Sequence, residues 1–295
     1  MTPHKPSPSV RHRVTRHLRR TSGAVQELLR ELRPAATLTH HPITHVHSPA
    51  AGDLRVASYN LHKCVGTDRR FDPVRSTAVI AELKADLVAL QEADRRFGRR
   101  TGLLDLKVLE RETGLAPLPV SDEPDGHGWH GNVLLVRPGT PARLRRLVLP
   151  GAEPRGALVA ELDLPMGQLR VVAAHLGLLR NCRKRQAAAI LHAIAESGDP
   201  MPTLLLGDLN EWRPGVRSSL RAFAPLFHET GLTPPSFPAR MPVFALDRIL
   251  GWPKGLVGGV TAHDTPLARI ASDHLPLTAT VRLEAAMRES IAKAA

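Results

Sequence analysis

Short apolar runs alternate with helical segments over most of the chain, from residue 54 onward. The segment at 73–83 has helical character, and 183–196 places its apolar residues on one face of a helix. The Pro-Met-Gly sequence at 165–167 predicts a turn that joins two apolar runs as a hairpin. This interleaving predicts an α/β fold with layered mixed sheets. The runs with strand character are 54–60, 86–91, 131–137, 157–164, 169–175, 203–206 and 279–283.

The first 50 residues differ from the rest because they mix Pro, His, Arg and Thr without sustained periodicity. One short amphipathic helix at 22–33 is the exception. We therefore expect a basic flexible arm over 1–50, one large domain over 51–285 and a short tail over 286–295. The arm either docks on a membrane or a partner, or packs against the body of the protein.

The charge of the chain is strongly basic, with a formal net value of +12. Residues 1–50 hold eight Lys or Arg against two acidic residues, which is +6, so half of the excess lies in the arm. Such a balance favours polyanionic partners such as nucleic acid or an anionic membrane surface. An arginine-rich composition with a solvated basic surface is the alternative explanation. No obligate protein partner is indicated.

Cysteine content and hydropathy indicate a cellular compartment. Cys64 and Cys182 are the only cysteines, and they form no Cys-x-x-Cys pair, so reduced structural thiols are expected. No apolar run reaches the roughly 18 residues of a membrane span, and no apolar stretch of a secretory signal follows the basic start. We therefore expect a cytoplasmic location.

Polar residues follow the apolar runs directly, where a sheet presents side chains at its rim. A lone carboxylate after a strand is more often a helix cap or a loop group, so only the whole set is informative. A hard cation such as Mg²⁺ prefers oxygen ligands, and one or two carboxylates beside a substrate phosphate suffice. These candidate residues are Asn60, Glu92, His175, Asp208 with Asn210, and Asp273 with His274.

Each residue type suggests a role. Glu92 is the first candidate for a direct metal ligand, with the amide oxygen of Asn60 beside it. Asp208 suits a group that orients or deprotonates water, and Asn210, two residues further on, would share its side of an extended segment. His274 or His175 could stabilise charge on the phosphate or protonate the leaving group, and Asp247 could hold His274 in one orientation.

The order of these segments resembles the signature of the endonuclease/exonuclease/phosphatase superfamily, across residues 54–283. The resemblance implies a DNase I-like fold, which is a four-layered α/β/β/α sandwich with two central mixed sheets and the active site at one rim. It also implies a divalent cofactor, Mg²⁺ or Mn²⁺. The matching motifs are Ser-Tyr-Asn-Leu-His at 58–62, Leu-Gln-Glu at 90–92, Ala-Ala-His-Leu at 173–176, Gly-Asp-Leu-Asn at 207–210 and Ser-Asp-His-Leu-Pro at 272–276.

The resemblance also assigns roles by position. It implies that Asn60, Glu92 and Asp273 bind metal, and that Asn132 contacts the substrate phosphate. Arg155 is either a further phosphate contact or a surface arginine. Arg248 stands where many relatives carry an aromatic residue, which weakens the case for substrate stacking there. The residues implied in catalysis are His175, Asp208, Asn210, Asp247 and His274.

Three functions remain open at this stage. Nuclease-type phosphodiesterase activity is favoured by the basic charge and by arginine clusters at 95–96, 99–100 and 143–146, although aromatic residues make up only 3% of the chain. Hydrolysis of a phospholipid or small phosphate ester near a membrane is the alternative, and the basic arm favours it. The third is an inactive relative that acts as a binding module, which is disfavoured because no expected polar position is lost.

Overall fold

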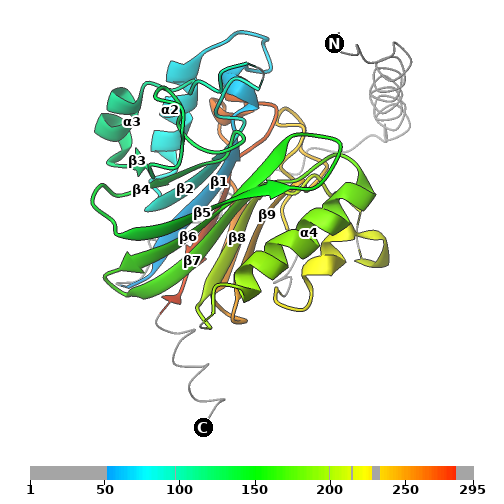
Figure 1. Ribbon diagram of the computed structural model, residues 1–295. Coiled ribbons are helices and arrows are strands. Elements are labelled where there is room, and N and C mark those ends of the chain that lie inside the picture. Colours follow the sequence, from blue (N-terminus) through cyan, green and yellow to red (C-terminus); the bar gives the residue numbers. More distant parts are fainter. Residues whose placement is uncertain (1–51, 97, 199, 214, 228–232, 284–295) are drawn as a thin grey trace, which may run out of the picture. The chain divides into compact units, whose positions relative to one another are not determined.

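The computed structural model describes residues 52–96, 98–198, 200–213, 215–227 and 233–283 (Figure 1). All of them fall within one compact unit of the chain. The arm at 1–50 with its helix at 22–33, and the tail at 286–295, lie outside the described residues. Within the described ranges, no helix has the length and apolar character needed to cross a bilayer.

The first sheet has six strands in the order β10-β11-β1-β2-β4-β3. Strands β1 and β2 are parallel, whereas β11 and β4 flank them in antiparallel orientation, so the sheet is mixed. The bounds are β1 Leu54–Asn60, β2 Leu87–Gln91, β3 Ala116–Pro117, β4 Val133–Val136, β10 Val257–Ala262 and β11 Leu277–Val281.

The second sheet has five strands in the order β5-β6-β7-β8-β9, and only the central pair β7 and β8 is parallel. Its strands are β5 Ala142–Leu149, β6 Arg155–Leu164, β7 Gly167–His175, β8 Thr203–Asp208 and β9 Asp247–Trp252. The helices are α2 Pro73–Glu82, α3 Leu106–Thr113, α4 Arg180–Ala195 and α5 Ala268–Ala271, with 3₁₀ turns η1 His62–Cys64, η2 Gly215–Arg217 and η3 Ser219–Phe223.

Three apolar clusters lie between four layers and confirm the predicted α/β/β/α sandwich. One cluster joins the facing surfaces of the two sheets, with Leu134 and Leu206 among its members. A second packs the first sheet against α2, α3 and α5, and a third packs the second sheet against α4 and η3. Figure 1 shows α2 and α3 on one outer side and α4 on the other. The central strands of each sheet are therefore buried on both faces, which accounts for strands such as β2 and β8 that are apolar along most of their length.

Most predicted elements are confirmed, including both helices and the hairpin at 165–167 between β6 and β7. Several elements were not predicted from the sequence, among them β5, α3 and β10. Strand β5 is an edge strand that carries Arg143, Arg145 and Arg146, and its alternation of exposed and half-buried positions hides its strand character. Strand β10 is also an edge strand, and its two adjacent glycines lower its apparent propensity.

We expect replacement of Leu206 by Ala to reduce the free energy of unfolding by about 2–5 kcal/mol, because its fully buried side chain lies between the two sheets. Urea denaturation monitored by circular dichroism measures this. The matched control is Val148→Ala on β5, where the residue is 71% exposed and the change should stay within about 0.5 kcal/mol. If Leu206→Ala lowers the free energy of unfolding no more than the control does, the two-sheet core is contradicted.

Candidate active site

Strand pairing brings the polar strand ends together at one edge of each sheet. In the second sheet, Asp208 at the end of β8 pairs with His175 of β7 on one side and Asp247 of β9 on the other. In the first sheet, Asn60 ends β1, and Glu92 directly follows the neighbouring parallel strand β2. The Nδ2 atom of Asn60 donates a 2.9 Å hydrogen bond to Oδ2 of Asp208, which joins the two sheets at this edge.

A buried Asp-His pair lies beside this junction, as the resemblance implied. Nδ1 of His274 is 2.8 Å from Oδ2 of Asp247, and the hydroxyl of Ser236 donates to the same oxygen. The other ring nitrogen, Nε2, is 3.8 Å from Oδ2 of Asp208. The ring of Phe237 lies 4.9 Å from the imidazole. The imidazole is therefore fixed between two carboxylates, with one nitrogen aimed at the junction of the sheets.

Burial and neighbouring charge shift the pKa values of these groups. Burial by itself would lower the pKa of His274, but the charges of Asp247 and Asp208 outweigh it and raise that pKa to about 10. Burial raises the pKa of Asp208 to about 6, against the opposing charge of His274. At neutral pH, His274 is therefore an imidazolium beside the carboxylate of Asp208, and this carboxylate takes up a proton more readily than an exposed aspartate does.

A small cationic cavity of about 20 Å³ opens on the other side of Asp208. Oε2 of Glu92 forms an ion pair with the ammonium of Lys63, which lowers the pKa of Glu92 against the effect of its burial. Four of the lining side chains are permanent cations, so the cavity suits an oxyanion such as a phosphate group. The lining residues are Lys63, Glu92, Asp94, Arg96, Arg100, His130, Gly131, Pro154, Arg155 and His175.

His175 connects this cavity with the buried carboxylate. Its Nε2 is 3.4 Å from Oδ2 of Asp208, and Nη1 of Arg155 lies 2.9 and 2.8 Å from its two ring nitrogens. Burial, together with the charge of Arg155, holds the pKa of His175 well below its usual value. His175 is thus a neutral imidazole whereas His274 is charged, so the two histidines suit different roles.

Two sets of groups at this edge are suited to a divalent cation. Ligand atoms of Asp208, Asp247 and His274 lie within 4.8 Å of one another. Among the described residues, Oδ1 of Asp247 is buried without a hydrogen-bond partner, so a carboxylate oxygen is available there. Carboxylate oxygens are donors that a hard cation prefers, so those of Asp208 and Asp247 fit a divalent metal, whereas the protonated His274 would have to lose its proton to bind one.

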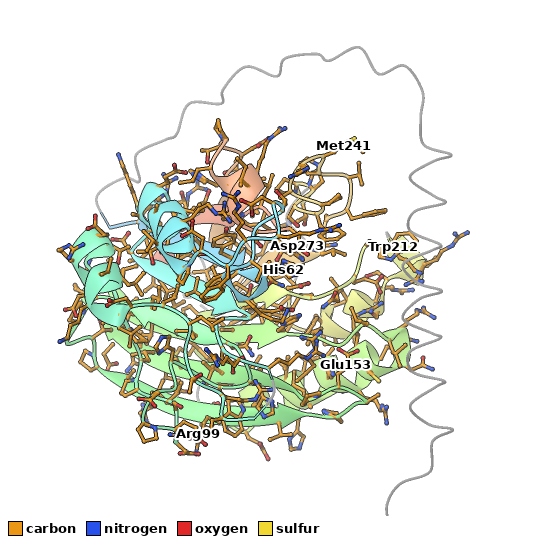
Figure 2. The ribbon with its side chains drawn as sticks, turned by 90° about the horizontal axis from the view of Figure 1, so that it is seen from above. His62, Arg99, Glu153, Trp212, Met241 and Asp273 are labelled. Atoms are coloured by element: carbon orange, nitrogen blue, oxygen red, sulfur yellow. The ribbon has the colours of Figure 1, made fainter. Side chains whose placement is uncertain are left out.

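The other set is the one that sequence assigned to metal, namely Asn60, Glu92 and Asp273. Oδ1 of Asn60 accepts a hydrogen bond from the backbone nitrogen of His62, whose ring nitrogen Nδ1 lies 3.8 Å from Oδ1 of Asp273 (Figure 2). Glu92 lines the cationic cavity and forms an ion pair there with Lys63. All three lie at the same edge of the molecule, and their assignment as ligands stays a prediction.

One expectation from the sequence is wrong, namely the geometry of Asn210. Strand β8 ends at Asp208, and Asn210 has a left-handed φ of 51°, so the two do not share one side of an extended segment. Instead, the backbone nitrogen of Asn210 donates to Oδ1 of Asp208, and its Nδ2 donates to the carbonyl of Leu176. Asn132 is also engaged, because its Nδ2 donates to the carbonyls of Trp129 and Gly156. Their roles toward substrate stay predictions.

A buried ion pair that was not predicted from the sequence supports the site from α4. Arg183 donates to the carboxylate of Glu211 over 3.0 Å and to the carbonyls of Gly177 and Leu178. It thereby ties the loop after His175 to the loop after Asp208. No local signal identifies this pair, because an arginine on an amphipathic helix is normally expected to face solvent.

The backbone at this edge is strained, which is typical of functional sites. Residues with left-handed φ are concentrated there, including Lys63 at 57°, Glu92 at 53° and His130 at 50°. Gly207 has φ 148°, and a Cβ on it would lie 1.8 Å from the carbonyl oxygen of Ala174. Glycine is therefore required directly before Asp208, since any side chain would separate β8 from β7.

Comparison with known proteins identifies relatives of this arrangement. The family model described as Endonuclease/Exonuclease/phosphatase family matches residues 57–274. The protein YbhP of Escherichia coli K12 is 30% identical over 254 residues, covering 78% of this chain and 96% of YbhP.

Solved structures are similar over the same region. An endonuclease/exonuclease/phosphatase from Beutenbergia cavernae has a TM-score of 0.59 at 24% identity, covering 78% of this chain and 72% of that one. The D. rerio TDP2 structure, in complex with a single-strand DNA product, has a TM-score of 0.56 at 15% identity and covers 77% of this chain and 98% of that one. At these identities the structures support the fold.

We expect the stability contributed by Glu211 to disappear in acid. Burial opposes ionisation, but hydrogen bonds from Ser219 outweigh it and lower the pKa of Glu211 from 4.5 to about 2. A lowered pKa stabilises the fold above pH 4.5, and the effect fades as pH falls. The stability difference between the native protein and Glu211→Gln should shrink by about 2 kcal/mol between about pH 6 and pH 3.

Urea denaturation at each pH measures this difference. The control is Glu196→Gln, because the Glu196 side chain is 57% exposed and its difference should show little pH dependence. If the stability difference between the native protein and Glu211→Gln does not change with pH, the buried network does not stabilise the ionised carboxylate of Glu211.

Proposed function

The chain belongs to the Endonuclease/Exonuclease/phosphatase family, whose members hydrolyse phosphate esters, and we propose that it is a divalent-metal-dependent phosphodiesterase. The observation that carries this proposal is the convergence of Asn60, Asp208, Asp247 and His274 at the edge of both sheets. Beside them lies a cavity rich in cationic side chains. Together they support the proposal that acid, base and oxyanion-binding groups act on one phosphate.

The residues divide the chemistry between them. Asp208, whose pKa of about 6 lies close to neutrality, orients the attacking water and accepts its proton. His274, kept protonated by Asp247, donates to the non-bridging oxygens as negative charge develops on them. Arg155 supplies a further hydrogen-bond donor from the cavity wall.

A divalent ion, Mg²⁺ or Mn²⁺, would be held by Glu92, Asn60 and Asp273. Bound there, it would supply Lewis acidity toward the phosphate and lower the pKa of water. The chain itself keeps the carboxylate of Glu92 ionised through Lys63, so this group is ready to bind a cation at neutral pH.

Two substrate classes follow from the proposal. Nuclease-type cleavage of nucleic acid is supported by the cationic cavity and by the likeness to TDP2, whose structure holds a DNA product. Cleavage of a phospholipid diester is the second candidate. It is supported by exposed apolar side chains on loops next to the site, such as Trp212 and Met241.

We expect Glu92→Ala and His274→Ala each to lower the rate of phosphodiester hydrolysis by about 100-fold or more. Glu92→Ala should also raise the Mg²⁺ concentration needed for half-maximal rate, whereas His274→Ala should leave it nearly unchanged. Initial rates on bis(p-nitrophenyl) phosphate across a metal titration test this, with Glu196→Gln as the control. Parental rates in both variants would show that the site is misassigned, and a parent protein without hydrolysis at any metal concentration would show an inactive binding module.

A substrate panel separates the two classes. Plasmid DNA, single-stranded DNA, RNA and phospholipid vesicles are each incubated with Mg²⁺ and with EDTA. We expect metal-dependent release of product from at least one class and none in EDTA, because the site requires a cation for full activity. Equal turnover with and without EDTA would refute the metal-dependent mechanism.

A further inference from the structure

Large apolar side chains are exposed on three loops next to the active site. One loop follows β7, the next follows β8, and the third precedes β9. Val216 is 77% exposed, Met241 59% and Trp212 46%. Soluble proteins seldom expose apolar side chains in groups, and such groups mark contact surfaces. We call this group the apolar rim, and its members are Leu178, Leu179, Trp212, Val216, Met241 and Val243.

The rim is connected to the catalytic groups by direct contacts. The ring of Trp212 lies 5.7 Å from that of Phe244, and the backbone of Phe244 pairs with that of Phe237, whose ring contacts His274. In the view of Figure 2, Trp212 and Met241 lie on the same side of Asp273. The rim therefore borders the site where a substrate must approach.

The loop that follows β7 is connected to the loop that follows β8 by hydrogen bonds. Arg183 bonds the carbonyl of Leu178 and the carboxylate of Glu211, so the loops that carry Leu178 and Trp212 are held together. Nδ2 of Asn210 donates to the carbonyl of Leu176 and adds a second link between them. The two loops thus form one rigid border rather than separate flexible segments.

The charge of these loops is of one sign. Across 177–185, 211–221 and 239–244 the only acidic residue is Glu211, which is fully buried and paired with Arg183. The exposed charged side chains of these segments, which include the start of α4 and residues of η2 and η3, are all basic, namely Arg180, Lys184, Arg185, Arg217, Arg221 and Arg240. A surface that combines aliphatic side chains with lysine and arginine complements a bilayer that contains anionic lipids.

A second recess favours a substrate with an apolar part. It has a volume of about 290 Å³ and shares Lys63 and Asp94 with the cationic cavity. Its remaining lining combines apolar side chains with one arginine, namely Val65, Phe71, Leu103 and Arg95. An amphiphilic phosphate ester could place its phosphate in the cavity and apolar atoms in the recess.

We propose that the apolar rim docks on the surface of an anionic phospholipid bilayer and presents the active site to a lipid phosphodiester. This rests on the proposed hydrolytic function and names its substrate class. Nucleic acid is the less favoured occupant, because five of the six rim residues are aliphatic and a base-stacking surface requires aromatic rings.

Vesicle flotation of the full chain tests the docking without any turnover. The lipids are phosphatidylcholine alone and phosphatidylcholine mixed with phosphatidylglycerol. We expect binding to the mixed vesicles, weakening with added NaCl because the basic residues contribute. Val216→Asp and Met241→Asp should each lower the partition coefficient by about tenfold or more, since a charge replaces an inserted apolar group. Val148→Asp, at a 71% exposed position on β5, is the matched control and should bind as the parent does.

The outcomes separate the docking from the hydrolysis. Flotation measures binding without product formation. If the protein hydrolyses no phosphodiester but still floats in a rim-dependent way, the hydrolytic proposal is refuted and the docking is retained. Parental flotation of both rim variants, verified as folded by their thermal unfolding, would overturn the docking. Loss of affinity for single-stranded DNA in both variants, with vesicle binding unchanged, would overturn it as well.

Discussion

The hydrogen bond from Asn60 to Asp208 is the contact through which the two sheets form one site. Each sheet supplies half of the chemistry, because Asn60 ends β1 and Glu92 directly follows β2 in the first sheet, whereas Asp208 and Asp247 belong to the second. Only the packing of the sheets brings the halves together. The apolar cluster between the sheets therefore fixes the catalytic geometry as well as the stability of the fold.

Burying several charges at this edge costs free energy, and the site offsets that cost by placing opposite charges next to one another. Asp247 and Asp208 lie on either side of the charged His274, and the cation of Lys63 lies against Glu92. Removing one partner would leave a neighbour buried and uncompensated, which costs more than losing an exposed pair. The left-handed backbone at Lys63 and Glu92 adds strain that the surrounding sheets must overcome. Groups held in this way need little reorganisation when charge develops on a substrate.

The sequence was sufficient to predict a layered α/β fold and the polar strand ends that meet at one edge, because apolar runs and the polar residues that follow them are local features. The roles of those residues stay predictions. Asp247 and His274 were assigned as a pair through the family resemblance, and the structure places them in contact. The geometry at Asn210 was mispredicted, since its left-handed turn is stabilised by hydrogen bonds that local sequence does not reveal. Pairs that are distant in sequence were also missed, because the burial of Arg183 and Glu211, 28 residues apart, depends on how α4 packs on the sheet.

Support of the site and recognition at its border depend on the same loops. Arg183 stabilises the loops that position His175 and Asp208, and those loops also carry Leu178 and Trp212 at the surface. A rigid border can contact a bilayer without moving the groups behind it, since the ion pair holds both loops to α4. Contact with lipid would also remove water from the mouth of the site and so strengthen the electrostatic interactions of the buried groups. In the proposed function, docking and catalysis would be coupled through one buried ion pair.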